Sequence, residues 1–197
     1  HDGRMIPISL VRLKSSKQNG MSKILLYAYG AYKHSVSPSF SASRFCLVDR
    51  GITFAIAHIR GGGDLGDNWH TEGKKKLKKN TFHDYIACAN HLIDQRYTHK
   101  GGLCFYGGSA GGLTGGSVAN MAPELFFAML LLVPFVDTMT TMLNEKLPLT
   151  PAEWELWGNP IKSKEYFDYI LSYSPYNNLG KKKYPPMLVT SSIFDNR

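Results

Sequence analysis

Short apolar runs alternate with longer amphipathic segments along this chain, and glycine, proline and polar residues separate them. This alternation is typical of a mostly parallel β-sheet that carries helices on both faces. The polar turn over Lys14–Gly20 separates the first two apolar runs, which are therefore predicted to form an antiparallel hairpin. We expect strands over Met5–Leu13, Lys23–Tyr29, Gly51–Ile59, Leu103–Tyr106, Ala128–Val133 and Pro186–Ser191.

Helical periodicity is clearest over Thr81–Gln95, which places its apolar residues on one face. Asn80 or Thr81 is expected to cap this helix. The glycines after Arg60 cannot hold a regular element and predict a loop. Further helices are expected over Gly111–Met121 and Lys164–Ser172, and an irregular or short helical insertion over Pro148–Pro160. Together these elements predict a single α/β domain over residues 1–197.

The composition is that of a globular protein, with 197 residues of which 43% are hydrophobic and 19% are charged. The longest apolar run, Leu125–Val136, is interrupted by Pro134 and is shorter than the ~20 residues that a membrane span needs. The three cysteines are odd in number and lack metal-ligand spacing, which favours a reduced, cytoplasmic compartment. A secreted, processed form remains the alternative.

The formal net charge is +8, and much of it comes from lysine runs at Lys74–Lys76, Lys78, Lys79 and Lys181–Lys183. Such runs attract nucleic acid or acidic lipid in some proteins. Here they lack the interleaved aromatic residues of a nucleic-acid reader. We therefore interpret them as a solvated face and expect neither nucleic acid nor a membrane as a partner.

The candidate chemistry centres on Ser109, in the segment Gly-Gly-Ser-Ala-Gly-Gly over residues 107–112. It follows a predicted strand directly and precedes a predicted helix, and this context makes Gly-x-Ser-x-Gly indicate a nucleophilic serine. The turn strains the serine backbone, exposes its Oγ, and aims the N–H of Ala110 at a developing oxyanion. A phosphate loop is the alternative, but the Walker lysine is missing and the glycine spacing differs from a dinucleotide fingerprint.

Hydrolases with this motif carry their triad in the order serine, acid, histidine. Asp195 follows the last predicted strand and is the favoured acid, while Asp137 is the competitor. All the histidines precede Ser109, so each is out of order for the general base, and His58 is predicted to be a satisfied core residue. We expect the chain alone to be nearly inactive. The histidines are His1, His34, His58, His70, His83, His91 and His99.

Several segments together resemble the prolyl oligopeptidase family. They are Tyr27–Tyr32, Ile59–Trp69, the turn over residues 107–112, and Ser172–Asn177. The segments Lys78–Tyr85, Val133–Asp137 and Glu155–Pro160 are similar to the oligopeptidase B branch. The resemblance covers essentially the whole chain.

The resemblance implies an α/β-hydrolase fold, truncated at its C-terminal end and paired in relatives with a seven-bladed β-propeller that this chain lacks. It implies Ser109 as nucleophile, Asp195 as acid, and the Tyr29 hydroxyl with the Ala110 N–H as oxyanion donors. The catalytic histidine would lie beyond Arg197. From the residues alone, Tyr29 is interpreted as an aromatic residue that packs at a strand end.

Oligopeptidase B cleaves after arginine or lysine, and the resemblance implies that Glu153 and Glu155 hold the basic side chain. From the residues alone, two carboxylates in a first helical turn usually interact with the helix dipole. A carboxylate pair can also accept charge-assisted, bidentate hydrogen bonds from a guanidinium group, which favours arginine. Ser37–Ser39 stands where relatives often carry acidic residues, which counts against a dibasic preference.

Short basic peptides are the expected ligands, and no metal or cofactor is expected. A non-catalytic remnant that binds basic peptides, one piece of a split enzyme, and an esterase-like hydrolase of the same fold are the alternatives.

Overall fold

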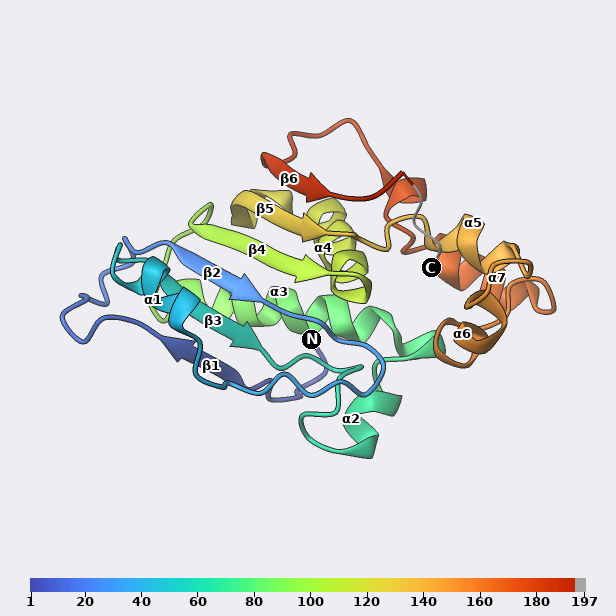
Figure 1. Ribbon diagram of the computed structural model, residues 1–197, viewed down its shortest axis with the longest axis horizontal. Helices are drawn as coiled ribbons and strands as arrows, with labels where there is room; N and C mark the ends of the chain where they lie inside the picture. Colours follow the sequence, from blue (N-terminus) through green and yellow to red (C-terminus); the bar gives the residue numbers. More distant parts are fainter. Residues whose placement is uncertain (194–197) are drawn as a thin grey trace.

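Within residues 1–193, which the computed structural model describes, a six-stranded sheet forms the centre of the protein (Figure 1). The strands follow the order β1-β3-β2-β4-β5-β6, and the pairing of β1 with β3 is antiparallel while the others are parallel. The predicted mostly parallel α/β fold is confirmed. The strands are β1 (Ile8–Val11), β2 (Ile24–Tyr27), β3 (Thr53–Ala57), β4 (Leu103–Gly108), β5 (Phe126–Leu132) and β6 (Met187–Thr190).

The predicted hairpin between the first two strands is wrong. β1 pairs with β3, so that Ile8 lies opposite Ala57, and β2 lies between β3 and β4 and pairs with both. The first three residues of β2 are buried because neighbours cover both its edges and both its faces. Such a continuous apolar run is typical of an interior parallel strand. The polar turn before it is only a connection.

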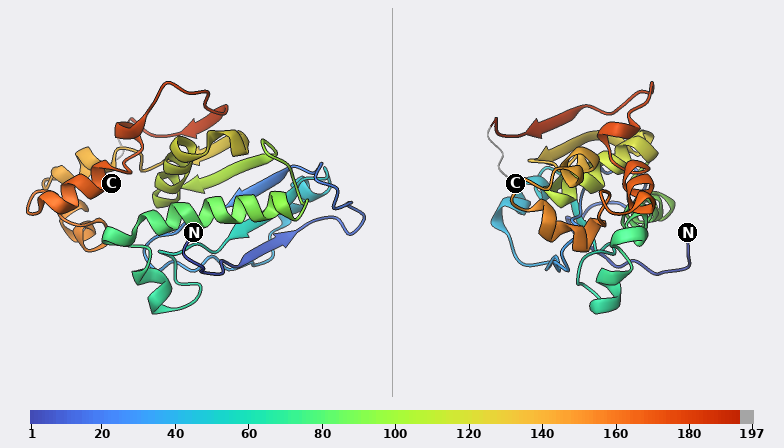
Figure 2. Two further views of the ribbon diagram at one scale, coloured as in Figure 1. Left: turned by 180° about the vertical axis from the view of Figure 1, so that it is seen from behind. Right: turned by 90° about the vertical axis from the view of Figure 1, so that its right-hand side faces the viewer.

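Helices cover the two faces of the sheet unequally (Figures 1 and 2). α3 (Lys79–Asp94) and α4 (Ala110–Met121) pack on one face, where they meet inward-pointing residues such as Leu26. On the opposite face, α1 (Ala42–Val48) packs near Leu25 through Leu47. This alternation of Leu25 and Leu26 is the period of two expected of a strand.

The remaining helices lie at the carboxyl ends of the strands or in loops. None of the helices between residues 1 and 193 is both long and apolar enough to cross a membrane. The predictions of α3, α4 and α7 are confirmed to within two residues, and α6 lies in the predicted insertion. The short α1, α2 and α5 were not predicted. These elements are α2 (Asp67–Thr71), α5 (Thr138–Leu143), α6 (Thr150–Trp157), α7 (Lys164–Leu171), and the 3₁₀ turns η1 (Lys75–Leu77), η2 (Pro123–Leu125) and η3 (Tyr176–Asn178).

The start of α3 differs from the prediction. The helix begins at Lys79, so neither Asn80 nor Thr81 caps it. Instead, Thr81 Oγ1 donates to the carbonyl oxygen of Arg60 at 2.8 Å, and Asn80 Nδ2 donates to that of Glu72 at 2.9 Å. Both side chains tie α3 to the loop that follows β3.

One lysine of the predicted solvated face is buried. Lys75 and Lys76 form ion pairs at the surface with Glu155 and Glu165. Lys78 is 0% exposed. The prediction of a solvated face is therefore wrong for Lys78. Lys75 and Lys76 belong to the surface turn η1, whereas Lys78 is the residue directly before α3 and its side chain is buried.

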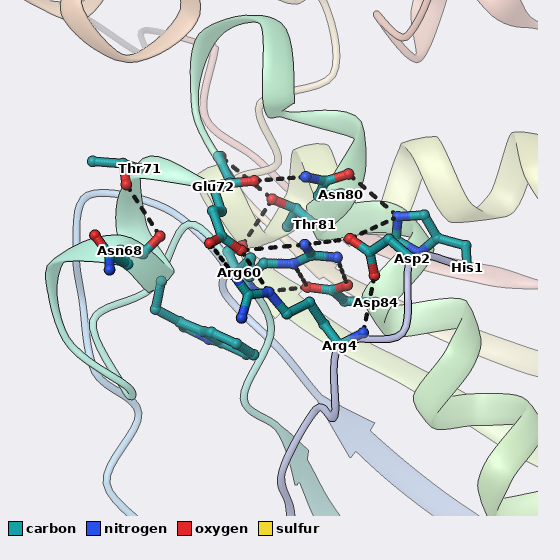
Figure 3. A network of polar contacts seen from close by, with 12 residues as sticks. His1, Asp2, Arg4, Arg60, Asn68, Thr71, Glu72, Asn80, Thr81 and Asp84 are labelled. Carbon is teal, nitrogen blue, oxygen red and sulfur yellow. Dashed lines mark hydrogen bonds and ion pairs between the residues drawn. The ribbon is translucent and has the colours of Figure 1, made fainter.

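A network of charges holds the N-terminal segment against the loop after β3 (Figure 3). The Arg60 side chain is 1% exposed, and it donates to both carboxylate oxygens of Asp84 on α3, at 2.8 and 2.5 Å. It also donates to Asp2 at 2.6 Å, and this bond lowers the pKa of Asp2. Glu72 completes the network with ion pairs to Arg60 and Arg4. The network joins three segments that are far apart in the chain.

Asp84→Asn is expected to lower the free energy of unfolding by about 3–5 kcal/mol, because Arg60 would stay buried without its main counter-charge. The matched control is Asp168→Asn, which removes the exposed pair with Lys164 on α7 and should cost less than about 1 kcal/mol. Urea unfolding followed by tryptophan fluorescence measures both. Similar small losses in the two variants would contradict a structural role of the Arg60–Asp84 pair.

Candidate active site

Ser109 lies at the turn between β4 and α4 with a strained backbone, at φ +52° and ψ −120°. Positive φ is uncommon for serine, so the surrounding structure has to hold the turn in place. The Ser109 N–H donates to the carbonyl oxygen of Leu132 at 2.9 Å, and the Phe135 N–H donates to that of Ser109 at 3.0 Å. Strain enforced in this way is typical of functional sites.

Close backbone contacts explain the glycines around this turn. A Cβ atom on Gly108 would lie 2.9 Å from the carbonyl oxygen of Leu132. A Cβ atom on Gly112 would lie 2.4 Å from the Cα atom of Pro134. The segment that follows β5 therefore packs directly on the turn, and only glycine fits at these two positions.

A cavity of about 640 Å³ lies beside Ser109. It forms where the parallel strands end, which is where open α/β sheets bind their ligands. Three of the predicted site residues, Ser109, Tyr29 and Glu153, lie on its wall. The lining also includes Tyr32, Phe135 and Asp137.

Ala110 begins α4, and Tyr29, which follows β2, packs beside this end of the helix. Thr114 Oγ1 donates to the carbonyl oxygen of Tyr29 at 3.2 Å, which fixes the tyrosine backbone beside the helix. A Cβ atom on Gly111 would lie 3.4 Å from the Tyr29 ring, so this ring packs against the first turn. Ala110 is the first residue of α4, and N–H groups there have no acceptor within the helix. Both residues therefore adjoin the turn at Ser109.

Glu153 projects from α6 into the cavity, and both its carboxylate oxygens accept hydrogen bonds. Tyr32 donates its hydroxyl to Oε1 at 2.7 Å, and Trp157 donates Nε1–H to Oε2 at 2.9 Å. Burial of Tyr32 and its bond to Glu153 raise the pKa of the tyrosine well above its usual range, so it remains a donor. The carboxylate is held in one orientation.

Glu155 points elsewhere. Its side chain is 82% exposed and pairs with Lys75, Nζ to Oε2, at 3.0 Å. This pair lowers the pKa of Glu155. The residue is not among those that line the cavity within residues 1–193. The structure therefore brings Glu153 to Ser109 and leaves Glu155 at the surface.

His58 is a satisfied core histidine, as predicted. Its Nδ1 lies 2.8 Å from Oδ1 of Asp64, and its Nε2 lies 2.9 Å from Oγ of Ser9. Burial favours the neutral acid of Asp64, but the bonds from His58 and from the Val36 N–H lower its pKa. In the part of the chain from 1 to 193, no histidine ring forms a hydrogen bond with the Ser109 side chain.

Of the two candidate acids, one lies within the described part of the chain. Asp137 accepts a hydrogen bond from the Thr140 N–H at 3.3 Å and so caps α5, while it also lines the cavity. Asp195 lies outside the described residues. Among residues 1–193, no three His, Cys, Asp or Glu side chains cluster as metal ligands would.

The sequence patterns assign no role to Tyr32 or Trp157. The ring of Trp157 is buried and packs edge-on to Tyr32, with centroids 5.9 Å apart, and it also contacts Phe135. Both residues belong to segments that carried the family resemblance, but neither shows periodicity or catalytic spacing. Their function as hydrogen-bond donors to Glu153 becomes visible only from their contacts.

Comparison with known proteins supports the resemblance seen in the sequence. Residues 38–197 match a family model described as the prolyl oligopeptidase family. The chain is 47% identical over 195 residues to "Protease 2" of Moraxella lacunata. This alignment covers 99% of the chain and 28% of that relative. It is also 47% identical over 197 residues to "Dipeptidyl aminopeptidase BI" of Pseudoxanthomonas mexicana. That alignment covers 100% of the chain and 27% of the relative.

The fold agrees with these matches. The structure of oligopeptidase B from Leishmania major superposes with a TM-score of 0.92 at 46% identity, over 95% of this chain and 26% of that one. The chain thus spans about a quarter of the length of the relatives it matches.

Proposed function

The chain belongs to the prolyl oligopeptidase family, and from this premise we propose that it is the catalytic part of a serine peptidase that cleaves short peptides after arginine or lysine. One observation carries the proposal. Ser109, Tyr29 and Glu153 come from three distant segments and line one cavity at the strand ends. A nucleophile, an oxyanion donor and a fixed negative charge are the groups that such a reaction needs.

In the proposed mechanism, Ser109 Oγ attacks the carbonyl carbon of the scissile bond. Its proton passes to a histidine, which the family resemblance assigns to a segment beyond Arg197, and the Ala110 N–H and the Tyr29 hydroxyl stabilise the oxyanion. The histidine then protonates the leaving amine. Water hydrolyses the acyl-enzyme by the same path in reverse.

We assign the acid of the triad to Asp195 rather than Asp137. The Asp137 carboxylate already accepts from the Thr140 N–H as the cap of α5. It also follows β5, the strand next to that of the nucleophile in the sheet, whereas the acid is expected after a later strand. Asp195, which follows β6 in the chain, agrees with that order.

Glu153 is suited to a guanidinium. Each carboxylate oxygen has two acceptor sites, and the bonds from Tyr32 and Trp157 use one on each oxygen. One site on each oxygen is left for a bidentate pair with arginine. Glu155 would have to leave Lys75 before it could contact a substrate, so we assign the larger share of basic specificity to Glu153.

We also propose partner segments and a cellular compartment for the enzyme. A β-propeller and a C-terminal segment are the proposed partners of this domain, by analogy with the family. Cys46, Cys88 and Cys104 are all free thiols, which supports a reduced, cytoplasmic compartment.

The test uses the full-length protein that contains this chain and N-acylated fluorogenic peptides with arginine, lysine or alanine before the scissile bond. We expect arginine and lysine peptides to be cleaved at least about 100-fold more efficiently than alanine peptides, because the wall of the cavity carries a fixed negative charge. Measured kcat/KM values decide the outcome. Absence of turnover, or cleavage of simple esters alone, would contradict the proposal.

A dipeptidyl aminopeptidase is the second candidate, because one relative of 47% identity carries that name. Such an enzyme needs a free amino group two residues before the scissile bond, so it would cleave the panel only after removal of the N-acyl group. Cleavage of the acylated peptides would exclude this candidate.

A further inference from the structure

A fully buried lysine lies beneath the candidate active site, and none of the proposed steps uses it. Lys78 is 0% exposed, and its Nζ donates to the carbonyl oxygen of Gly30 at 2.6 Å and to Thr81 Oγ1 at 3.1 Å. An ammonium group buried in this way is costly unless several partners compensate it. Burial lowers the pKa of Lys78 to about 7, although the negative charge of Asp84 opposes this shift.

The first of these bonds acts on the oxyanion tyrosine. Gly30 directly follows Tyr29, and its backbone is held tightly, since a Cβ atom there would lie 2.5 Å from Cγ2 of Thr81. The Lys78 ammonium therefore holds the peptide group between Gly30 and Ala31, directly after Tyr29, and so restrains the backbone that carries Tyr29. Loss of this bond would leave the Gly30 carbonyl buried without its charged donor.

A further contact of Lys78, with the ring of Trp157, connects it to Glu153. Nζ of Lys78 lies 5.2 Å from the ring centroid of Trp157, within the range of a cation–π interaction. Trp157 in turn donates Nε1–H to Oε2 of Glu153. The ammonium group thus fixes the indole that orients Glu153.

No uncharged side chain could make both contacts. A methionine has nearly the same length and would fill the space at a lower desolvation cost. It could not donate to Gly30, and it would replace the cation–π attraction to Trp157 by the contact of an uncharged thioether. The two contacts are therefore specific to the ammonium group and are not a matter of volume.

We propose that Lys78 is a positioning residue. It holds Tyr29 in place through Gly30, and it holds Glu153 in place through Trp157. The Glu153 half of this inference rests on the proposed function. The Tyr29 half applies to any acyl transfer by Ser109.

A double-mutant cycle in the full-length protein tests the Tyr29 half. Lys78→Met is expected to lower kcat about 10- to 100-fold on a neutral ester, because a small displacement of an oxyanion donor costs this much. In a Tyr29→Phe background the same change should lower kcat less than about 3-fold. Equal losses in both backgrounds, or no loss in the single variant, would overturn the proposal.

Selectivity between arginine and alanine substrates tests the Glu153 half. Lys78→Met should reduce the kcat/KM ratio at least 5-fold. Lys78→Gln should retain more of kcat than Lys78→Met, because it keeps a donor for Gly30, but it should lose selectivity to the same extent. This variant also serves if the methionine variant does not fold, and a glutamine variant with full selectivity would overturn the Trp157 link.

The control is Lys76→Met, which removes an exposed lysine that pairs with Glu165 and should leave both readouts unchanged. If arginine selectivity is absent in the wild type while the Lys78–Tyr29 coupling persists, the proposed function fails and the positioning role stands. If selectivity is present but the coupling is absent, the positioning role fails alone.

Discussion

Replacing Ser109 by alanine is expected to abolish covalent labelling by a fluorophosphonate probe and to reduce peptide hydrolysis by at least about 10⁴-fold. Its backbone is held at φ +52° by bonds to Leu132 at the end of β5 and to Phe135 just after it, and the Tyr29 ring and the first N–H groups of α4 lie beside it. Alanine keeps this geometry and removes only the attacking oxygen. In-gel fluorescence of the full-length protein and kcat/KM on an arginine peptide measure the two effects.

The control is Ser117→Ala, farther along α4, where the hydroxyl donates to the carbonyl oxygen of Tyr173 and labelling should be retained. The chain of 197 residues alone should be labelled far more slowly than the full-length protein. Its histidines within residues 1–193 form no hydrogen bond with Ser109, so no general base is in place. Labelling of the Ser109→Ala variant would show that another residue is the nucleophile.

Glu153→Gln is expected to lower kcat/KM on arginine peptides by about 100-fold, with less than about a 3-fold change on a neutral ester. The substitution removes the negative charge from the cavity and leaves the length of the side chain unchanged. Glutamine can accept from Trp157 through its amide oxygen and donate its NH₂ to the Tyr32 hydroxyl oxygen, so the substitution removes the charge while both partners can stay paired. Steady-state kinetics on both substrate classes measure the difference.

Glu155→Gln is the matched control, one amide for one carboxylate on the same helix. Because Glu155 pairs with Lys75 at the surface, its loss should change arginine selectivity much less than that of Glu153. The double variant should resemble Glu153→Gln. Equal losses on the neutral ester and the arginine peptide would mean that Glu153 is structural and that arginine is recognised elsewhere.

The sheet and the turn at Ser109 could be predicted because local rules determine them. Apolar runs such as β3 identify buried strands, and the glycines around Ser109 reflect contacts of one turn with its immediate neighbours. Pairing partners are different. β1 adds to β3 because β2 already uses both its edges in parallel pairs, which depends on the whole sheet.

The site was predicted in part for the same reason. The two glutamates of α6 are two positions apart, which places them about 200° apart around a helix. Only Glu153 can therefore face the cavity, and this follows only once the segment is known to be helical. The burial of Lys78 could not be predicted at all, because its neighbours in sequence are surface lysines and its partners Gly30 and Trp157 are far away in the chain.

β6 has a practical consequence for work with the 197-residue chain. All four of its residues are exposed, and within residues 1–193 it pairs along one edge only, with β5. An open, apolar strand edge is a template for pairing with another copy and so for aggregation. Solubility screens of this chain should therefore start from low protein concentration, and a charged residue in place of Leu188 is the first change to try.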